Sequence, residues 1–319
     1  MSRCLVVGAG KMGIAHLQTV AALAPEAFAA WAPSDRHRAA VEASGAQLLG
    51  GSLEDALQAF GATHVFIASP VETLAPIALR VLATGVRHIL LEKPAALTLF
   101  EGHQLLTAAK DLGAQIFVGY NRRFYASVRT ALSLINTAAE QIESVLFEFN
   151  EVVADPAGPK GHARHVKDRW LLANSMHVVD TAFHAVGLPD VQKSHFHHFA
   201  ALSWHAAGSI FVGSGATLTG VPFAYHANWD SPGRWGFEWM TKSTRYVFRP
   251  MEKLSVMRRG QFNLEPVDIE DEMDIRFKPG VYHQNKAFLD GNLSSGLVTL
   301  QAAVDLIALA QRLAGYPDN

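Results

Sequence analysis

The sequence has only one cysteine, Cys4. A single thiol cannot form an internal disulfide, so a reducing compartment is the default expectation. The first ten residues, MSRCLVVGAG, also lack the charged and apolar regions of a secretory signal peptide, because they run directly into a strand and a glycine loop. We therefore expect a cytoplasmic protein.

Long apolar runs and an excess of one charge are absent too. No stretch approaches the ~18 apolar residues of a transmembrane helix, which predicts no membrane partner. Lysine and arginine together number 27 and the acidic residues 29, for a net charge of -2. Because the two signs are mixed along the chain, we expect no nucleic-acid partner, which would need a basic surface.

The composition that remains is typical of a well-cored globular protein. Of the 319 residues, 49% are hydrophobic and 18% charged, which excludes a disordered chain. This length favours two domains of ordinary size. The chain has no internal repeat and no low-complexity linker.

The first third of the chain alternates short apolar runs with longer amphipathic ones. Expected strands cover residues 4–7, 28–31, 65–68, 88–92 and 115–119, and the first two expected helices cover residues 11–23 and 35–43. Strand–helix alternation with continuous Val, Ile and Leu in the strands is typical of a doubly wound parallel sheet. We predict an α/β fold with an N-terminal Rossmann domain over residues 1–121.

The pattern changes after residue 121. Residues 144–151 alternate, with Val145, Phe147 and Phe149 on one side, as in a half-buried strand. Residues 191–249 hold several more strand-like runs separated by turn signals, and residues 299–314 form a final amphipathic helix. We predict a second α/β domain over residues 122–319 with a large, mostly antiparallel open sheet.

Gly8, Gly10 and Gly13 have G-x-G-x-x-G spacing directly after the first strand and at the start of a helix. Gly8 permits the tight turn, Gly10 lets a pyrophosphate approach the backbone, and Gly13 lets helix and strand pack closely. The helix N-terminus offers free N–H groups to phosphates. The loop, with Lys11 and Met12, therefore predicts a dinucleotide site.

The end of the second strand concerns the choice between NAD and NADP. The acid that usually binds the adenosine ribose is missing at Ala32-Pro33, and Ser34, Arg36 and Arg38 follow. Serine and arginine suit a 2'-phosphate, since guanidinium groups donate charge-assisted hydrogen bonds to it. The expected cofactor is NAD(P), with NADP slightly favoured. The alternative is that both arginines belong to a solvated helix start.

Three further stretches complete a family pattern. IASPVETL (67–74), HILLEKPAA (88–96) and VGYNRRF (118–124), together with GAGKMG, resemble the Gfo/Idh/MocA oxidoreductases, a family of NAD(P)-dependent sugar and polyol dehydrogenases. The resemblance implies an open second sheet that often forms a subunit interface, hence a homodimer or homotetramer. It also implies cofactor contacts from Ser69, Pro70, Glu92, Lys93 and Asn121, with Lys93 near both the nicotinamide and the substrate hydroxyl.

The resemblance is incomplete at the family's catalytic D-x-x-x-H helix. His177 and the later acid Asp180 match it, but Ala173 takes the place of the usual catalytic aspartate. His177 remains a candidate catalytic base, since histidine titrates near pH ~6.5, and a structural histidine is the alternative. Asn174 is either a helix N-cap or, with Asp180, a substitute for the missing aspartate in orienting His177.

The expected helix over residues 175–186, ending at Gly187, has an apolar face. Met176, Val179, Phe183 and Val186 form this face, while His177, Asp180 and His184 form a neighbouring stripe. Three positions spread along a helix in this way are too far apart for one metal ion. His195, His197 and His198 suit the polar faces of a strand, so we expect no metal site.

Candidate substrate-binding residues flank these motifs. They are Arg122, Arg123, Arg164, Asn174 and Asp180, and the segment 225–239 adds Trp229, Arg234 and Trp235. Aromatic rings with flanking polar groups suit the faces of sugars, whereas packing at a dimer interface is the alternative for the tryptophans.

The sequence thus predicts an oxidoreductase that transfers a hydride between a nicotinamide cofactor and a secondary alcohol or ketone of a sugar or sugar derivative. Lys93 and His177 are its expected catalytic residues. Because Ala173 lacks the carboxylate, two alternatives remain: a non-catalytic dinucleotide-binding sensor or regulator, and a reductase of a C=N or C=C substrate.

Overall fold

A computed structural model describes residues 2–292 and 295–317. The chain divides into two compact units. Of the described residues, the first unit comprises those up to 121 together with those of 273–307, and the second comprises 122–272 together with 308–317. The predicted second domain, 122–319, included residues 273–307. These residues cluster with the first unit because helix α10 (Val281–Leu289) packs against α1 (Lys11–Leu23) and strand β15 (Val298–Thr299) pairs with β6 (Gln115–Val118).

The first unit contains a seven-stranded sheet in the order β15-β6-β5-β4-β1-β2-β3. Its other strands are β1 (Arg3–Val7), β2 (Ala27–Trp31), β3 (Gln47–Leu49), β4 (His64–Ile67) and β5 (His88–Leu91). Every pairing is parallel except that of β15 with β6. The predicted doubly wound sheet is confirmed; the sequence analysis did not identify the short strands β3 and β15.

Helices connect these parallel strands. They are α1, α2 (Arg38–Ala43), α3 (Leu53–Phe60), α4 (Leu74–Ala83) and α5 (Leu99–Asp111), while α9 (Glu272–Arg276) precedes α10. Short 3-10 turns cover Asp35–His37, Val71–Thr73 and Asn121–Phe124. Helix α5 begins with a capping box. The Thr98 hydroxyl accepts a hydrogen bond from the Glu101 backbone N–H, and the Glu101 carboxylate accepts one from the Thr98 backbone N–H. Helix α11 (Leu300–Ala314) follows β15.

The second unit contains an eight-stranded sheet in the order β14-β13-β12-β11-β7-β10-β9-β8. The strands are β7 (Ser144–Phe149), β8 (His195–Phe199), β9 (Ile210–Ala216), β10 (Pro222–Asn228), β11 (Trp235–Met240), β12 (Thr244–Phe248), β13 (Ser255–Arg258) and β14 (Glu265–Pro266). Only β7 and β10 pair in parallel among these strands. The prediction of a mostly antiparallel sheet is therefore confirmed.

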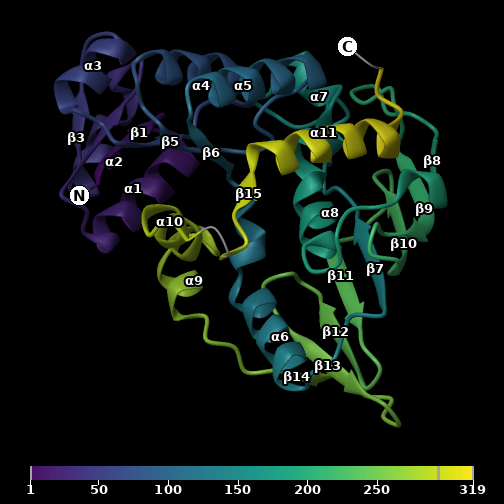
Figure 1. The fold of residues 1–319 in the computed structure, drawn as a ribbon. Helices are drawn as coiled ribbons and strands as arrows, with labels where there is room; N and C mark the ends of the chain where they lie inside the picture. Colours follow the sequence, from purple (N-terminus) through teal and green to yellow (C-terminus); the bar gives the residue numbers. More distant parts are fainter. Residues whose placement is uncertain (1, 293–294, 318–319) are drawn as a thin grey trace. The chain divides into compact units, whose positions relative to one another are not determined.

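One face of this sheet is covered by helix α8 (Met176–Phe183), which packs on β7 and β11 (Figure 1). The alternation in β7 buries Val145, Phe147 and Phe149, and the indole N–H of Trp239 donates to the Ala182 carbonyl at 2.8 Å. Helices α6 (Ala126–Thr137) and α7 (Arg164–Lys167) and a π-helical turn, Leu171–Ser175, precede α8.

The expected helix over residues 175–186 differs from the observed one at both ends. The π turn supplies residues 171–175, and α8 ends at Phe183. Gly187 has a φ of +78° and donates its N–H to the Phe183 carbonyl, so a glycine closes this segment as expected.

A buried ion pair anchors α8. Arg123 donates from Nε to Asp180 Oδ2 at 2.8 Å and from Nη2 to Oδ1, and the Asp180 side chain has no exposed surface. Burial raises the pKa of the Asp180 carboxyl, and the Arg123 guanidinium opposes that shift. Burial also lowers the pKa of His184 to about 3, with Arg123 adding to the effect. Asp180 is therefore buried because Arg123 compensates its charge, whereas His177 and His184 of the same stripe are half-buried.

Replacing Asp180 with alanine should strongly destabilise the protein. Asp180→Ala leaves the guanidinium of Arg123, whose side chain is 15% exposed, without its carboxylate partner, and we expect a loss of about 3–5 kcal/mol in the free energy of unfolding. Urea unfolding measures this value. The control is Arg258→Ala, which removes an ion pair with Glu265 whose side chains are 57% and 47% exposed. Equal unfolding midpoints for the two variants would contradict the prediction.

Candidate functional site

The glycine loop lies at the carboxyl end of β1 and is built around two close approaches. Gly8 has a φ of +107°, and a Cβ atom added to it would lie 2.4 Å from the Ala68 carbonyl oxygen. A Cβ atom on Gly13 would lie 1.9 Å from the Gly8 carbonyl oxygen. By contrast, a Cβ atom on Gly10 would meet no atom within 4 Å. Two glycines are thus required by packing, and the third leaves open space at the loop.

This open space lies at the N-terminus of α1. Gly10 is the N-cap residue, so no side chain caps the helix. The first turn carries no acidic residue. Lys11 is exposed, Met12 is half-buried, and the first N–H groups of a helix lack partners within the helix. Helix N–H groups beside open space fit the pyrophosphate of a dinucleotide.

The loop also lies at the point where the sheet reverses its order. β1 is flanked by β2 on one side and by β4 on the other, and ligands of doubly wound sheets bind at such a switch point. Ser69 and Pro70 follow β4, and Thr73 donates its hydroxyl to Ser69 Oγ at 2.9 Å. The backbone nitrogen of Ser69 would lie 3.2 Å from a Cβ on Gly8. Ser69 therefore borders the glycine loop.

The residues after β2 differ in their ion pairs and in their exposure to solvent. Arg38 lies 3.0 Å from an Asp35 carboxylate oxygen and 3.6 Å from one of Glu42. Ser34 and Arg36 are exposed. Arg38 is thus engaged within its own helix start, whereas Ser34 and Arg36 remain candidates for an adenosine ribose or its phosphate.

Glu92, expected at the cofactor, is 8% exposed and belongs to a buried network. His16 Nε2 lies 3.0 Å from Glu92 Oε1, and His16 Nδ1 lies 3.0 Å from Asn285 Oδ1. Asn285 in turn donates to the Thr19 hydroxyl. This network ties the residue before Lys93 to α1 and α10, so Glu92 holds the strand end that carries the half-buried Lys93.

Asn121, also expected at the cofactor, is 4% exposed and donates from its amide to the Pro279 carbonyl at 2.8 Å. Its side chain therefore fixes residues 273–307 to the end of β6. For both Glu92 and Asn121, cofactor contact remains a prediction, while their contacts in the structure position neighbouring backbone.

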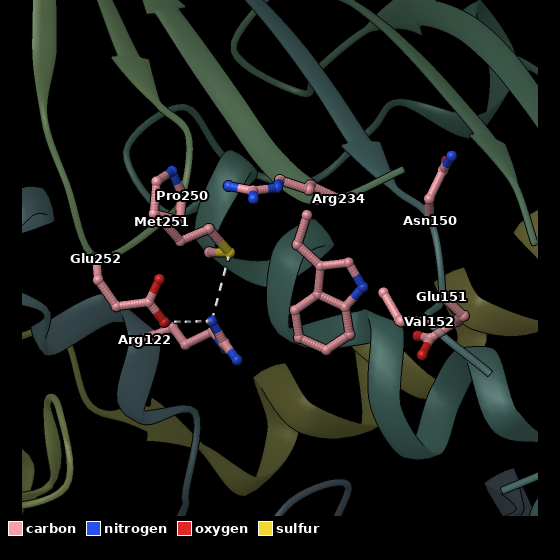
Figure 2. A pocket seen from close by; sticks show the side chains of 9 residues that line it. Arg122, Asn150, Glu151, Val152, Arg234, Pro250, Met251 and Glu252 are labelled. Carbon is pink, nitrogen blue, oxygen red and sulfur yellow. Dashed lines mark hydrogen bonds and ion pairs between the residues drawn. The ribbon is translucent and has the colours of Figure 1, made fainter. Parts of the chain in front are cut away.

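A pocket of about 390 Å³ opens in the second unit (Figure 2). Its lining combines cationic, acidic, aromatic and apolar side chains: Arg122, Asn150, Glu151, Val152, Arg234, Trp235, Pro250, Met251 and Glu252. The volume lies within the range typical of small-molecule sites. Arg122 and Glu252 lie on one side of the pocket and Glu151 on the other (Figure 2). Of the predicted substrate-binding residues, Arg122, Arg234 and Trp235 line the pocket.

Arg122 is held on its side of the pocket by several contacts. Its guanidinium carbon lies 4.7 Å from the ring centroid of Trp235 and 5.3 Å from that of Tyr125. Nη1 also lies 3.5 Å from a Glu252 carboxylate oxygen and 3.7 Å from the Met251 sulfur. Arg234, on the same pocket, is exposed. The pocket therefore presents a fixed arginine and a solvent-exposed one.

Glu151 is a buried carboxyl group in the wall of this pocket, 7% exposed. Asn174 donates from Nδ2 to its two oxygens at 3.1 and 2.8 Å, and the Ser175 hydroxyl donates to Oε1 at 2.6 Å. Both donors belong to the π turn, immediately after Ala173. Asn174, expected to cap the helix or bind substrate, instead holds Glu151.

His177 lies in the first turn of α8 and is half-buried. Its ring centroid is 6.4 Å from that of Trp235, which lines the pocket. Asp180, proposed to orient His177, pairs instead with Arg123, as described above. The Asp180 carboxylate has no exposed surface, so these two residues anchor α8, and their contact with a substrate stays a prediction.

Two other predicted residues lie away from the pocket lining. Arg164 is largely exposed and donates to Asp168 at 2.9 Å and to the Ser203 carbonyl at 3.0 Å. Trp229 is 4% exposed, and its indole N–H donates to the Phe149 carbonyl at 3.0 Å. Trp229 is therefore part of the core, whereas Arg234 and Trp235 from the same segment, 225–239, line the pocket.

The lining residues that were not predicted from the sequence include Glu151, Met251 and Glu252. The sequence does carry a signal for Glu151. It lies two residues after Phe149 and so continues the alternation that places Val145, Phe147 and Phe149 on the buried side of β7. An acidic residue is unusual at a position that this alternation predicts to be buried. Met251 and Glu252 follow β12 in a turn, and nothing local distinguishes them.

In the described part of the chain, no group of three or more His, Cys, Asp or Glu side chains could hold a metal ion. No helix there is both long and apolar enough to cross a membrane.

Comparison with known proteins agrees with this architecture. Residues 2–120 match the Gfo/Idh/MocA family, described as an oxidoreductase family with an NAD-binding Rossmann fold. No curated protein matches the sequence. The family resemblance inferred from the motifs is therefore supported over the N-terminal part.

Solved structures match over nearly the whole chain. UDP-N-acetylglucosamine 3-dehydrogenase GnnA from Acidithiobacillus ferrooxidans has a TM-score of 0.75 at 17% identity, covering 98% of this chain and 96% of that one. Levoglucosan dehydrogenase, in complex with NADH and L-sorbose, has a TM-score of 0.78 at 17% identity with the same coverage. GenD2 from gentamicin A biosynthesis, in complex with NAD, has 0.70 at 22%, covering 98% and 94%. The chain shares the fold of these proteins, and its residues 2–120 match the NAD-binding oxidoreductase family.

Proposed function

We propose that the protein is an NAD(P)-dependent oxidoreductase that transfers a hydride between a nicotinamide cofactor and a secondary alcohol or ketone of a sugar or sugar derivative. The glycine loop is the main support for this proposal. There is no room for side chains at Gly8 and Gly13, whereas Gly10 borders open space at a helix N-terminus. The family match over residues 2–120 and the sugar dehydrogenases of similar fold support it.

In this proposal the loop and its neighbours hold the cofactor. The first turn of α1, with Lys11 and Met12, would bind the pyrophosphate, and Ser69, Pro70 and Lys93 would contact the nicotinamide end. When bound, the nicotinamide supplies the hydride donor or acceptor. Glu92 would act through its hydrogen bond with His16 by fixing the strand end that precedes Lys93.

The pocket of the second unit would bind the substrate. Trp235 offers an aromatic face to C–H groups of a sugar ring, while Arg122, Arg234 and the acidic residues of the lining can bind hydroxyl or anionic groups. Oxidation of a secondary alcohol to a ketone releases a proton together with the hydride. Lys93 and His177 are the residues proposed to take this proton.

Ala173 favours one alternative. Because this position lacks the carboxylate that the family usually carries, a non-catalytic dinucleotide-binding sensor or regulator is the second candidate function, and a reductase of C=N or C=C substrates is a third. Each would bind cofactor through the same loop. Turnover of a sugar distinguishes the proposed function from both.

We also propose that the protein is cytoplasmic and self-associates as a homodimer or homotetramer through the open face of the second sheet. Arg249, just after β12, forms ion pairs with Glu148 on β7 and with Glu238 on β11. A polar, hydrogen-bonded sheet face is compatible with a subunit interface.

Gly10 and Gly13 should respond differently to substitution by alanine. Gly10→Ala adds a methyl group where no atom lies within 4 Å, so stability should be kept while the Kd for the cofactor rises about 10- to 100-fold through lost phosphate hydrogen bonds. Gly13→Ala forces the backbone apart and should cost about 1–3 kcal/mol of stability. Calorimetric titration with NADH and NADPH and thermal melting measure both effects. Unchanged cofactor affinity in Gly10→Ala would refute this cofactor site.

Arg36 should determine any preference for NADP. If Arg36 binds a 2'-phosphate, Arg36→Ala should raise the Kd for NADPH about tenfold and leave that for NADH unchanged. Arg38→Ala is the matched control and should have a smaller effect, because Arg38 is already paired with Asp35. A wild-type protein that binds NADH more tightly than NADPH would exclude the preference.

A screen of levoglucosan, L-sorbose and UDP-N-acetylglucosamine with both cofactors tests the activity, followed through nicotinamide absorbance. With a sugar that turns over, Lys93→Ala and His177→Ala should each lower kcat about 10²- to 10⁴-fold through lost proton transfer. Unchanged turnover in both variants would refute these catalytic residues. Tight cofactor binding with no turnover of any sugar would favour the regulator.

A further inference from the structure

The π turn before α8 lacks a carboxylate of its own. Ala173 is 5% exposed and donates its N–H to the Arg169 carbonyl at 2.9 Å. The acid three residues after His177, Asp180, is committed to Arg123. Neither position on this helical segment therefore provides a carboxyl group to the pocket.

Glu151 brings a carboxyl group to the same turn from another element. It lies two residues beyond the end of β7, and its side chain accepts hydrogen bonds from the two residues that follow Ala173. Ser175, the nearer donor at 2.6 Å, is fully buried. Two protein donors from one turn thus fix the orientation of the Glu151 carboxyl group, so it needs little reorganisation to bind a ligand.

The fixed carboxyl group also faces a ligand-sized space. Glu151 lines the pocket together with Trp235 and Arg122, and it lies on the side opposite Arg122 and Glu252 (Figure 2). Burying a carboxyl group is costly compared with an amide. Asn174 and Ser175 are neutral donors that a glutamine at this position could also satisfy in part.

We propose that Glu151 is the substrate-binding carboxylate of this pocket, accepting hydrogen bonds from hydroxyl groups of the substrate and supplying from β7 the acidic group that is missing at Ala173. Asn174 and Ser175 are positioning residues, which hold this carboxylate toward the pocket. The inference rests on the proposed function, because it names the group that would recognise a hydroxylated substrate.

The test compares Glu151→Gln, Glu151→Asp and wild type by calorimetric titration with the three sugars of the activity screen in the presence of NADH. Glu151→Gln retains the size and part of the hydrogen bonding of the side chain but removes its charge. Because a hydrogen bond to a charged group is stronger than one to an amide, the Kd for the sugar should rise about 10- to 100-fold. Glu151→Asp, which keeps the charge, should recover part of the affinity.

The matched control is Glu148→Gln, which changes a residue of β7 that is paired with Arg249 and absent from the pocket lining. It should bind the sugars as wild type does. Cofactor affinity and melting temperature should be the same in Glu151→Gln and wild type, which separates sugar binding from a structural role. Ser175→Ala should weaken sugar binding less than Glu151→Gln, because Asn174 still holds the carboxylate.

The outcomes separate the two proposals. If wild type binds or oxidises a sugar and Glu151→Gln does so equally well, the role of Glu151 is refuted while the proposed function stands. If Glu151→Gln loses sugar binding only together with cofactor affinity and melting temperature, Glu151 is structural and the inference also fails. If wild type binds NADH but none of the sugars, both proposals are refuted.

Discussion

Hydrogen bonds to buried carboxyl groups position the candidate residues in each unit. Burying a carboxyl group costs folding free energy unless its oxygens have hydrogen-bond partners. The partners of Glu92, Asp180 and Glu151 therefore constrain the positions of the elements to which they belong. Glu92 with His16 and Asn285 fixes the strand end before Lys93. Asp180 with Arg123 fixes α8, which carries His177. Glu151 joins the end of β7 to the π turn before α8. The same residue type thus serves as anchor in two places and faces a pocket in the third.

The two candidate sites differ in what supplies their specificity. At the glycine loop, the recognition groups are backbone N–H groups and empty space, so side chains matter mainly by being absent. In the pocket of the second unit, recognition of the proposed substrate would depend on side chains from four separate segments, around residues 122, 151, 234 and 251. A loop of the first kind suits a cofactor common to many enzymes, whereas a pocket of the second kind can vary with the substrate.

Several features could be predicted because they depend on local spacing. Gly8, Gly10 and Gly13 are close in sequence, and their spacing predicted the turn after β1. The period of two in β7 predicted the buried side of that strand. The spacing of His177 and Asp180 predicted their common stripe on α8 but not its burial, because the partner Arg123 is 57 residues away in sequence.

The sequence by itself determined the doubly wound sheet, the mostly antiparallel second sheet and the dinucleotide loop, since periodicity and glycine spacing act over a few residues. Only the tertiary structure decided that residues 273–307 return to the first unit, where Asn285 and Pro279 meet distant partners. It also decided that Asn174 holds Glu151 and that Trp229 is core. These outcomes depend on contacts between segments far apart in the chain, and local spacing carries no information about which polar groups will meet.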